Sequence, residues 1–551
     1  MRPDYSRSYD DILNSDCPLK ASRFMLALYL PRSDFLQSTK LRSFLLQHLD
    51  VDHHAVAITD GSSRLTWAEL DQQICARVGW LTANVFGEKD SGQGACKPGD
   101  RVGLLMQNQS DYIPCVLAAV SAGLWVVPIN WHLTTAEQRY IVEDSGMRQL
   151  LCPSEYLDRD LGCQCIAVSA PAVAGEGLAQ AVGAASPAGG IMLYTSGTTG
   201  KPKGVQRRSP KTLGELKSQW LNVAAGIGLN GGVHLITGPL YHAAPLLFAL
   251  YDLLNGAALV VMPKFDAESA LRLIDQFGVS HSHWVPTMFV RALRLPESER
   301  ASFSGRSMTL VLHGAAPVAP AVKRSVIDWW GPVLVEYWGG SESGAVSRCS
   351  SEEWLARPGN VGKVLPQYEV VATHEGKILG EGEIGLLGIR PRSGDQAFSY
   401  WQDAEKTSKA YIRGAMFQLG DIGYVKDNYV YLLDRESHTV ISGGVNLYPA
   451  EIEASLLEQT VILDVVVLGV PDEEWGERLI AVVEVVDAGR DLLAMENGEV
   501  SLAQQILAEA AILLASYKLP RELHFGAVER NAAGKVPLAT LRARYGLATQ
   551  V

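Results

Sequence analysis

Short apolar segments alternate with helical patterns along this chain from residue 41 onward, and this alternation is the strongest constraint on its fold. A helical pattern at 41–49 precedes a strand-like segment at 55–59. Two further apolar segments of strand length, 100–106 and 124–129, flank a helical pattern at 111–123. Strands that alternate with helices predict parallel sheets covered by helices. The pattern therefore predicts the α/β class.

The chain divides into three parts of different pattern. Residues 1–40 have no clear period and are interpreted as an N-terminal extension. A large unit follows over 41–436, in which a second α/β series gives way near residue 366 to a β-rich stretch with glycine turns. Residues 437–551 contain the glycine pair at 443–444, a plausible articulation point, and then strand and helix patterns of their own. We therefore expect a small C-terminal domain over 437–551.

Composition narrows the class of protein. The 551 residues include 60 acidic and 48 basic side chains, for a formal charge of −12, and 47% are hydrophobic. These values exclude disordered and fibrous chains, and the acidic balance argues against nucleic-acid binding, which needs a basic face. No apolar run reaches the roughly 18 residues of a membrane span, and the polar N-terminus lacks the apolar core of a signal peptide.

The cysteines indicate the compartment. Eight cysteines are sparse and irregularly spaced, which is typical of reduced thiols, so we expect a cytoplasmic protein. Cys163 and Cys165 lack a second pair with metal-ligand spacing, and we interpret them as structural.

The segment 194–205, YTSGTTGKPKGV, concentrates glycine, hydroxyl and lysine side chains after an apolar strand. Glycine lets backbone amides close around a polyphosphate, hydroxyls add hydrogen-bond donors, and lysines add positive charge. The order is not that of a Walker loop, because a proline follows Lys201. We predict a nucleotide-phosphate site made by Thr195, Ser196, Gly197, Thr198, Thr199, Gly200, Lys201 and Lys203.

This segment resembles the phosphate-binding signature of the adenylate-forming superfamily, which includes acyl- and aryl-CoA ligases, luciferases and the adenylation domains of peptide synthetases. The resemblance runs from about residue 42 to 545 and is closest in motif to acyl-CoA synthetases. It implies a large N-terminal domain of two α/β subdomains plus a β-rich subdomain, with a small mobile α+β C-terminal domain. It also implies ATP- and Mg²⁺-dependent activation of a carboxylic acid as an acyl-adenylate, release of pyrophosphate, and transfer to the thiol of CoA as the domains alternate.

Further segments resemble nucleotide-binding elements of the same family. In EYWGGSE, 336–342, the resemblance places Trp338 against adenine or in the wall of the acyl pocket, and makes Glu342 the Mg²⁺ ligand. Asp421 and Arg435 resemble the pair that holds ribose and phosphate. The implied nucleotide-binding set also includes Gly314, Ala315, Ala316, Gly339 and Ser341.

Two catalytic side chains are implied by other motifs. Lys535, in ERNAAGKV, resembles the lysine that bridges the acid and ATP during adenylation, and His242, in PLYHAAP, resembles the residue beside the carboxylate. Together with Glu342 and Thr195 they form the implied catalytic set. The implied acid pocket consists of His242, Thr287, Gly314, Gly339 and Gly340.

The pocket positions favour an aryl acid over a fatty acid, because several of them are glycines that leave room for a flat ring. Tyr241 and His242 stand where amino-acid-activating relatives carry an aspartate, which argues against an α-amino acid substrate. His281 and His283 follow a probable strand and are interpreted as core or pocket-wall residues rather than metal ligands.

Two departures from the family pattern concern the second half-reaction. Val445 stands where relatives carry a glutamate, and Ser437 stands at a hinge position that is usually aspartate or lysine. The changes leave three chemistries open: transfer to CoA, transfer to another acceptor such as a carrier-protein thiol or an amine, and adenylation of another oxyanion such as nitrite to diazotise an aryl amine. A non-catalytic nucleotide-binding protein is disfavoured, because such a protein has no use for Lys535.

Overall fold

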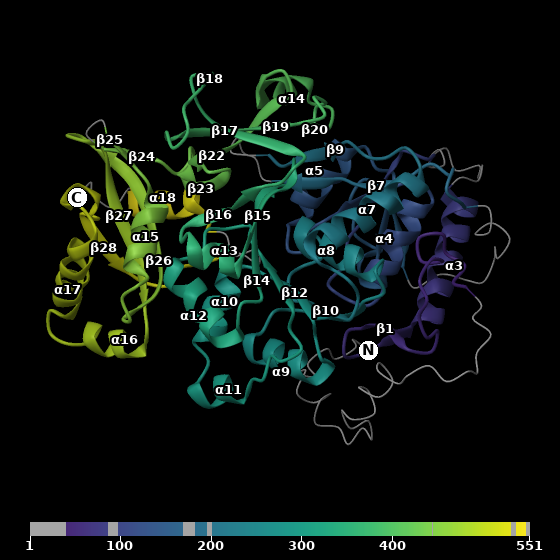
Figure 1. The fold of residues 1–551 in the computed structure, drawn as a ribbon, viewed down its shortest axis with the longest axis horizontal. Coiled ribbons are helices and arrows are strands. Elements are labelled where there is room, and N and C mark those ends of the chain that lie inside the picture. Colours follow the sequence, from purple (N-terminus) through teal and green to yellow (C-terminus); the bar gives the residue numbers. More distant parts are fainter. Residues whose placement is uncertain are drawn as a thin grey trace.

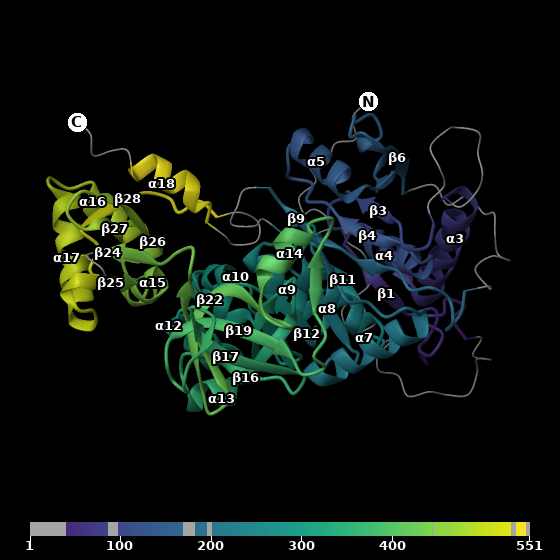
Figure 2. The ribbon, with the colours of Figure 1, turned by 90° about the horizontal axis from the view of Figure 1, so that it is seen from above.

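The computed structural model describes residues 40–85, 97–168, 182–195, 201–442, 445–530 and 536–546. Figure 1 shows a large body that carries most of the sheets and a smaller lobe at one end, formed by the elements from Val440 onward. Figure 2 shows the same separation from above. The predicted α/β class, with a large N-terminal part and a small C-terminal part, is confirmed.

The first α/β unit is built on a five-stranded parallel sheet. Its strands are β3 (Arg101–Leu104), β4 (Trp125–Pro128), β5 (Gln149–Cys152), β6 (Gln164–Ala167) and β7 (Gly190–Ile191), in the spatial order β6-β5-β3-β4-β7. Its helices are α3 (Trp67–Val85), α4 (Tyr112–Ser121) and α5 (Thr135–Ser145), with a 3₁₀ turn at Ser154–Tyr156. Every residue of α4 is buried, which makes it a core helix. A capping box of Thr134 and Glu137 starts α5, and Gly146 ends it in the left-handed conformation.

The second α/β unit is the parallel half of a larger sheet. Its strands lie in the order β11 (Ala258–Val261), β10 (Val233–Ile236), β12 (His281–Trp284), β13 (Leu310–His313) and β14 (Leu334–Gly340), with β1 (Val56–Thr59) and β2 (Arg64–Thr66) beyond β11. Its helices are α7 (Leu213–Ile227), α8 (Ala243–Leu253), α9 (Ala267–Phe277), α10 (Pro286–Leu293), α11 (Glu297–Ser302) and α12 (Pro320–Trp330). All residues of β10 to β13 are buried, as expected for parallel strands covered on both faces.

The β-rich region continues this sheet. β15 (Gly344–Ser350) turns back antiparallel on β14, and the order continues with β16 (Asn360–Val364), β23 (Tyr429–Arg435), β22 (Met416–Lys426), β19 (Gly385–Pro391), β17 (Tyr368–His374) and β18 (Lys377–Ile378). β21 (Tyr411–Arg413) pairs with β22, and the helices are α13 (Ser351–Ala356) and α14 (Ala404–Ala410). A small sheet of β20 (Phe398–Tyr400), β9 (Lys203–Arg207) and β8 (Leu193–Thr195) joins this region to the first unit.

The C-terminal lobe has a sheet and cores of its own. Its strands are β24 (Val440–Ser442), β25 (Val445–Leu447), β26 (Ile462–Asp472), β27 (Gly476–Val485) and β28 (Glu522–Phe525). Its helices are α15 (Pro449–Leu456), α16 (Asp487–Leu493), α17 (Gly498–Leu513) and α18 (Leu538–Gly546), with a 3₁₀ turn at Ser516–Lys518. Two hydrophobic clusters consist entirely of residues from Val440 onward.

Most predicted elements of the first unit are confirmed. The segments 55–59, 100–106, 111–123 and 124–129 contain β1, β3, α4 and β4. The helical pattern at 41–49 is wrong, since these residues form turns. The Asp71 carboxylate, from α3, accepts the backbone N–H groups of Arg42 and Ser43 at 2.9 and 2.7 Å and so ties this segment to α3.

Two further observations bear on the sequence predictions. None of the helices in the described part of the chain has the length and apolarity needed to cross a membrane. Cys163 and Cys165 are free thiols, and the described residues contain no cluster of metal-ligating side chains. The N-terminal extension lies outside the described residues up to position 39.

Candidate active site

A cavity of about 1920 Å³ opens where the sheets of the large body meet. Its described lining comes from residues 128–437 and includes the ends of β4, β8, β9, β14 and β23 and faces of α7 and α8. Pockets that hold one small molecule usually measure roughly 300–1,000 Å³. The cavity therefore has room for a nucleotide and a second substrate at the same time.

The strands that flank the predicted phosphate loop, β8 and β9, pair antiparallel as a hairpin. The hairpin pairs Leu193 with Val205 and Thr195 with Lys203, and Thr195 lines the cavity. The predicted residues Ser196, Gly197, Thr198, Thr199 and Gly200 lie outside the described residues. On the two sides of these residues, Thr195 and Pro202 line the cavity.

Lys203 holds the base of this hairpin. Its Nζ lies 3.0 Å from Oδ1 of Asp144, which comes from α5, and the hydroxyl of Tyr194 donates to the other oxygen of the same carboxylate at 2.8 Å. The hydrogen bond to Asp144 raises the pKa of Lys203, which therefore stays charged. Lys203 does not belong to the described cavity lining. Lys201 is exposed, with its Nζ 5.1 Å from the centre of the Tyr140 ring.

Glu342 stands in the turn between β14 and β15. Gly340, Ser341 and Glu342 all line the cavity, and the hydroxyl of Tyr400 donates to Oε1 of Glu342 at 3.2 Å. Burial and the neighbouring carboxylate raise the pKa of Tyr400, so this tyrosine remains a hydrogen-bond donor. One oxygen of Glu342 is thus engaged by a neutral hydroxyl, and the carboxylate retains acceptor capacity for a hard cation such as Mg²⁺.

The predicted ribose pair is brought together by strand register. Asp421 of β22 lies opposite Arg435 of β23, and the Arg435 Nε is 3.0 Å from Oδ1 of Asp421. Arg435 lines the cavity, and the Asp421 carboxylate is buried. The arrangement presents the arginine fork to the cavity while the aspartate orients it.

Trp338 lies beside the predicted ribose pair and outside the described cavity lining. Its side chain is only 6% exposed, belongs to a hydrophobic cluster and lies outside the cavity lining, and its Nε1 donates to Oδ2 of Asp421 at 2.9 Å. The indole therefore braces the Asp421–Arg435 pair. The neighbouring Tyr337, on the other face of β14, lines the cavity instead. Stacking of Trp338 on adenine remains a prediction.

The segment after β13 approaches the cavity closely. A Cβ on Gly314 would lie 2.7 Å from the carbonyl oxygen of Tyr337, so only glycine fits there without movement. Ala315 lines the cavity with a positive φ of 69°, a strained conformation for alanine. Ala316 is half-buried, and neither it nor Gly314 is part of the lining.

We call the part of the cavity that α8 lines the acid branch, because His242 of the predicted acid pocket directly precedes this helix. His242 is the residue before α8 and lines the cavity, as do Gly339 and Gly340. One face of α8 continues the wall with Ala244, Leu247, Phe248 and Tyr251. Thr287, also predicted for this pocket, is half-buried and not part of the lining.

Aromatic rings enclose this branch. Nε2 of His283 and the hydroxyl of Tyr337 share a hydrogen bond of 3.0 Å, and the Tyr337 ring meets Phe248 edge to face at 5.3 Å. Burial lowers the pKa of His283 to about 3, so the imidazole is neutral near pH 7. A flat ring could pack here against the faces and edges of aromatic neighbours.

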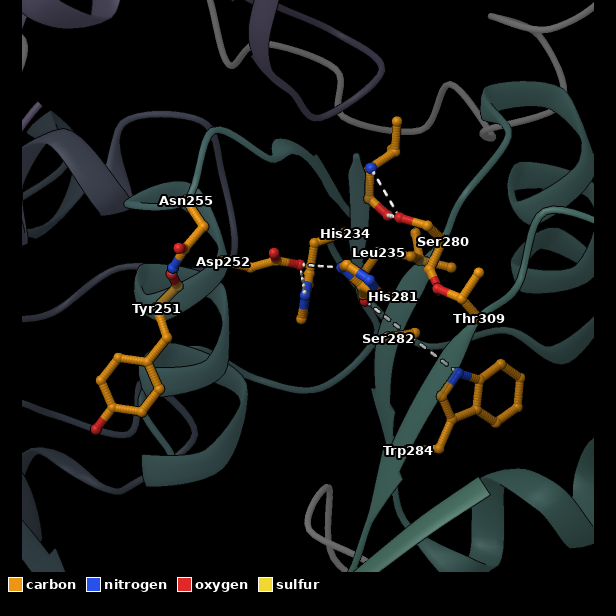
Figure 3. A network of polar contacts seen from close by, with 11 residues as sticks. His234, Leu235, Tyr251, Asp252, Asn255, Ser280, His281, Ser282, Trp284 and Thr309 are labelled. Atoms are coloured by element: carbon orange, nitrogen blue, oxygen red, sulfur yellow. Dashed lines mark hydrogen bonds and ion pairs between the residues drawn. The ribbon is translucent and has the colours of Figure 1, made fainter. Parts of the chain in front are cut away.

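A buried polar network anchors α8 (Figure 3). Oδ2 of Asp252, near the end of α8, lies 3.0 Å from Nδ1 of His234 in β10 and 2.7 Å from Nδ1 of His281 in β12. Burial alone would raise the pKa of Asp252, but the two histidine hydrogen bonds hold it below its usual value. His281 is thus a core residue, and the network fixes the helix whose other turns line the acid branch.

The remaining predicted residues concern the hinge and the C-terminal domain, and only some of them belong to the described residues. Ser437 lines the cavity, and Val445 is 47% exposed on the C-terminal lobe. Lys535 and the glycine pair at 443–444 lie outside the described residues.

Sequence reasoning missed several residues of the site. Arg207 stands two residues after the phosphate signature, and Tyr337 lies inside the motif 336–342, so proximity to a motif could have indicated both. Asp144 and Tyr400 are 59 and 58 residues from the side chains they contact, and no local pattern marks them.

Comparison with known proteins agrees with this geometry. Residues 46–397 match the AMP-binding enzyme family, and residues 451–535 match the AMP-binding enzyme C-terminal domain. The chain belongs to the AMP-binding enzyme family. It is an ATP-dependent adenylate-forming ligase, and both its motifs and its curated relatives are those of acyl-CoA synthetases.

Three relatives illustrate the range of acids named among the similar proteins. Long-chain-fatty-acid–CoA ligase FadD13 of Mycobacterium tuberculosis is 30% identical over 472 residues, which cover 81% of this chain and 88% of that protein. Feruloyl-CoA synthase of Amycolatopsis sp is 28% identical and covers 93% of this chain and all of that protein. The structure of o-succinylbenzoate CoA synthetase from Bacillus subtilis, in complex with its acyl-adenylate intermediate, has a TM-score of 0.74 at 25% identity and covers 91% of this chain and 98% of that one.

Proposed function

We propose that this protein converts a carboxylic acid into an acyl-adenylate with release of pyrophosphate and then transfers the acyl group to the thiol of CoA. One observation carries the proposal: a single cavity joins the base of the phosphate hairpin, the Glu342 carboxylate and the Arg435 fork to an aromatic branch beside His242. This arrangement suits a reaction between a nucleotide and a second, apolar molecule.

In the first step, a carboxylate oxygen attacks the α-phosphorus of ATP. The new O–P bond forms as the bond from the α-phosphorus to the bridging oxygen breaks, and pyrophosphate leaves with the electron pair. The hairpin positions the phosphates through Thr195 and the loop that follows it. Glu342 would hold Mg²⁺, which supplies neutralisation of phosphate charge when it is bound.

The nucleoside sugar is held by Arg435 and the Asp421 carboxylate that orients it, with Trp338 fixing the aspartate from behind. Lys535 is the residue that we expect to orient the reacting oxygens, by analogy with the family motif. Such a group acts by positioning and by electrostatic stabilisation, and its removal typically costs about 10²–10³ in rate.

The acid lies in the branch along α8. Aromatic side chains support an aryl acid over a fatty acid, because rings packed edge to face form a wall of fixed shape around a flat ring. The neutral His283 and the Tyr337 hydroxyl give this wall one polar point that could accept or donate a hydrogen bond.

In the second step, the C-terminal domain turns about Ser437, withdraws Lys535 and admits the acceptor. The thiol sulfur attacks the acyl carbon, the bond from that carbon to the phosphate oxygen breaks, AMP leaves with the electron pair, and the thiol proton passes to solvent. Val445 presents an exposed apolar side chain where relatives carry a glutamate, and this observation favours a second candidate, in which the acceptor is a carrier-protein thiol or an amine.

A mass-resolved turnover assay tests the proposal. Purified protein is incubated with ATP, Mg²⁺ and matched aryl and fatty acids, with and without CoA. A CoA thioester formed with equimolar AMP supports the ligase. An acyl-adenylate that CoA leaves unchanged supports another acceptor, and amines, carrier protein and nitrite are then tested in turn. Absence of any acid-dependent pyrophosphate release refutes the proposal.

A further inference from the structure

Arg207 lines the cavity, and its guanidinium pairs with no carboxylate among the residues that the structure describes. It ends β9, is half-buried and lines the cavity, and its two terminal nitrogens lie 3.0 Å from the position that a Cβ on Gly344 would take. Within the described part of the chain, no hydrogen bond or ion pair engages its guanidinium. The acidic side chains of the lining, Glu215, Glu342 and Glu436, form no ion pair with it in these described ranges.

Arg208, the residue after β9, shows how an ordinary surface arginine is paired. Its side chain is 67% exposed and forms an ion pair with Asp395. The two arginines differ because successive side chains of a strand point to opposite faces. A guanidinium that loses water without a partner is costly, and its planar fork matches a carboxylate through two parallel hydrogen bonds.

Arg207 and Tyr251 line the same cavity, and Tyr251 lies toward the end of α8 that is away from His242. Burial raises the pKa of Tyr251, and the charge of Arg207 opposes that rise, so the cation lies near this phenol. Tyr251 is on the same face of α8 as Ala244, which follows His242 by two residues. Seven residues separate Ala244 from Tyr251, a distance of roughly 10 Å along a helix axis.

We propose that Arg207, assisted by the hydroxyl of Tyr251, binds a second carboxylate at the far end of the acid. The substrate is a dicarboxylic acid whose middle, flat and apolar, packs between Phe248 and the glycines of β14. One carboxylate faces His242 and reacts, and the other pairs with Arg207. This inference rests on the proposed function, since it takes the His242 end of the branch as the reacting end.

The test compares acids that differ only at the far end. Benzene-1,4-dicarboxylate is paired with 4-methylbenzoate, and 4-carboxycinnamate with 4-methylcinnamate, so that two lengths are covered. Acid-dependent ATP–pyrophosphate exchange is measured with the wild-type protein, R207M, R207K and R208M, and melting temperatures establish that the variants are folded. Binding of each dicarboxylate without ATP is measured by calorimetry.

A charge-assisted hydrogen bond contributes about 1.5–3 kcal/mol, so the wild-type protein should prefer at least one dicarboxylate over its methyl partner by about 10- to 100-fold in kcat/KM. R207M should abolish this preference and the calorimetric binding, R207K should restore part of both, and R208M should behave as wild type. The preference should reside in KM for the acid.

Three outcomes overturn the inference. The preference for the dicarboxylate is absent from the wild-type protein, or R207M leaves it intact. Alternatively, R207M raises KM for ATP or for CoA and leaves the acid unaffected, in which case Arg207 binds a phosphate. Failure of the proposed function is distinguishable from these, because it gives no exchange with any acid of the panel or with a fatty acid.

Discussion

Replacement of Asp252 tests whether the buried network that anchors α8 also holds the acid branch in place. Asp252→Leu removes the acceptor of two buried N–H groups, those of His234 and His281. Loss of one partner of a buried charged group costs about 3–5 kcal/mol, so we expect the free energy of unfolding to fall by that amount. Asp252→Asn keeps an acceptor oxygen. Asp252→Asn should lower the free energy of unfolding by only about 1–2 kcal/mol, since the two hydrogen bonds from the histidines lose their charged acceptor but not their partner.

The network also predicts a pH dependence with a definite sign. Asp252 has a pKa below its usual 3.8 in the folded protein, so its contribution to stability is present above pH 3.8 and is lost as the pH falls through the lowered value. The wild-type advantage over Asp252→Asn should therefore be complete at neutral pH and shrink in acid.

Urea denaturation followed by tryptophan fluorescence measures these differences. Asp395→Leu, which removes only the exposed ion pair with Arg208, is the control and should change stability by less than about 1 kcal/mol. Because Asp252 anchors α8, KM for the acid should rise in Asp252→Asn while KM for ATP stays unchanged. If Asp252→Leu is no more destabilising than Asp395→Leu, the reasoning is refuted.

Two further replacements test the nucleotide side of the cavity. Tyr400→Phe removes the hydrogen bond to Glu342, worth about 0.5–1.5 kcal/mol, so the Mg²⁺ concentration for half-maximal adenylation should rise about 2- to 10-fold; an unchanged requirement in a Mg²⁺ titration contradicts this. Asp144→Asn removes the carboxylate that raises the pKa of Lys203, a contribution present below the ordinary lysine pKa and lost as the pH rises through the raised value. We expect activity to fall off at lower alkaline pH in this variant, and a pH profile that matches the wild type would be evidence against the anchor.

The alternating pattern of the first unit was sufficient to predict β3, α4 and β4, because α4 is buried throughout and most residues of its flanking strands are buried. The segment 41–49 shows the limit of that reasoning. Leu41, Leu45 and Leu46 are buried as on one face of a helix, but the segment forms turns that are tied to α3, where Asp71, 28 residues away, accepts the N–H of Ser43. Local pattern carries no information on such a distant partner.

In the site as well, the sequence predicts some features and leaves others open. Motif resemblance predicted that Asp421 and Arg435 act together, and strand register does place them opposite each other. The same resemblance put the ring of Trp338 beside the ligand, whereas the indole donates to Asp421 from the buried side. Which face of β14 meets the cavity depends on how β14 pairs with β13 and β15, and a motif alone does not specify that pairing.

The two-step account is tested most directly by separating the half-reactions in Lys535→Ala. Adenylation is measured as acid-dependent pyrophosphate release, and thioester formation is measured from supplied acyl-adenylate and CoA. Lys518→Ala, which removes a lysine paired with Glu451 elsewhere on the C-terminal lobe, is the matched control. The account predicts that Lys535→Ala slows adenylation about 10²–10³-fold and leaves thioester formation near the wild-type rate. Equal loss of both half-reactions, or retention of adenylation, would contradict it.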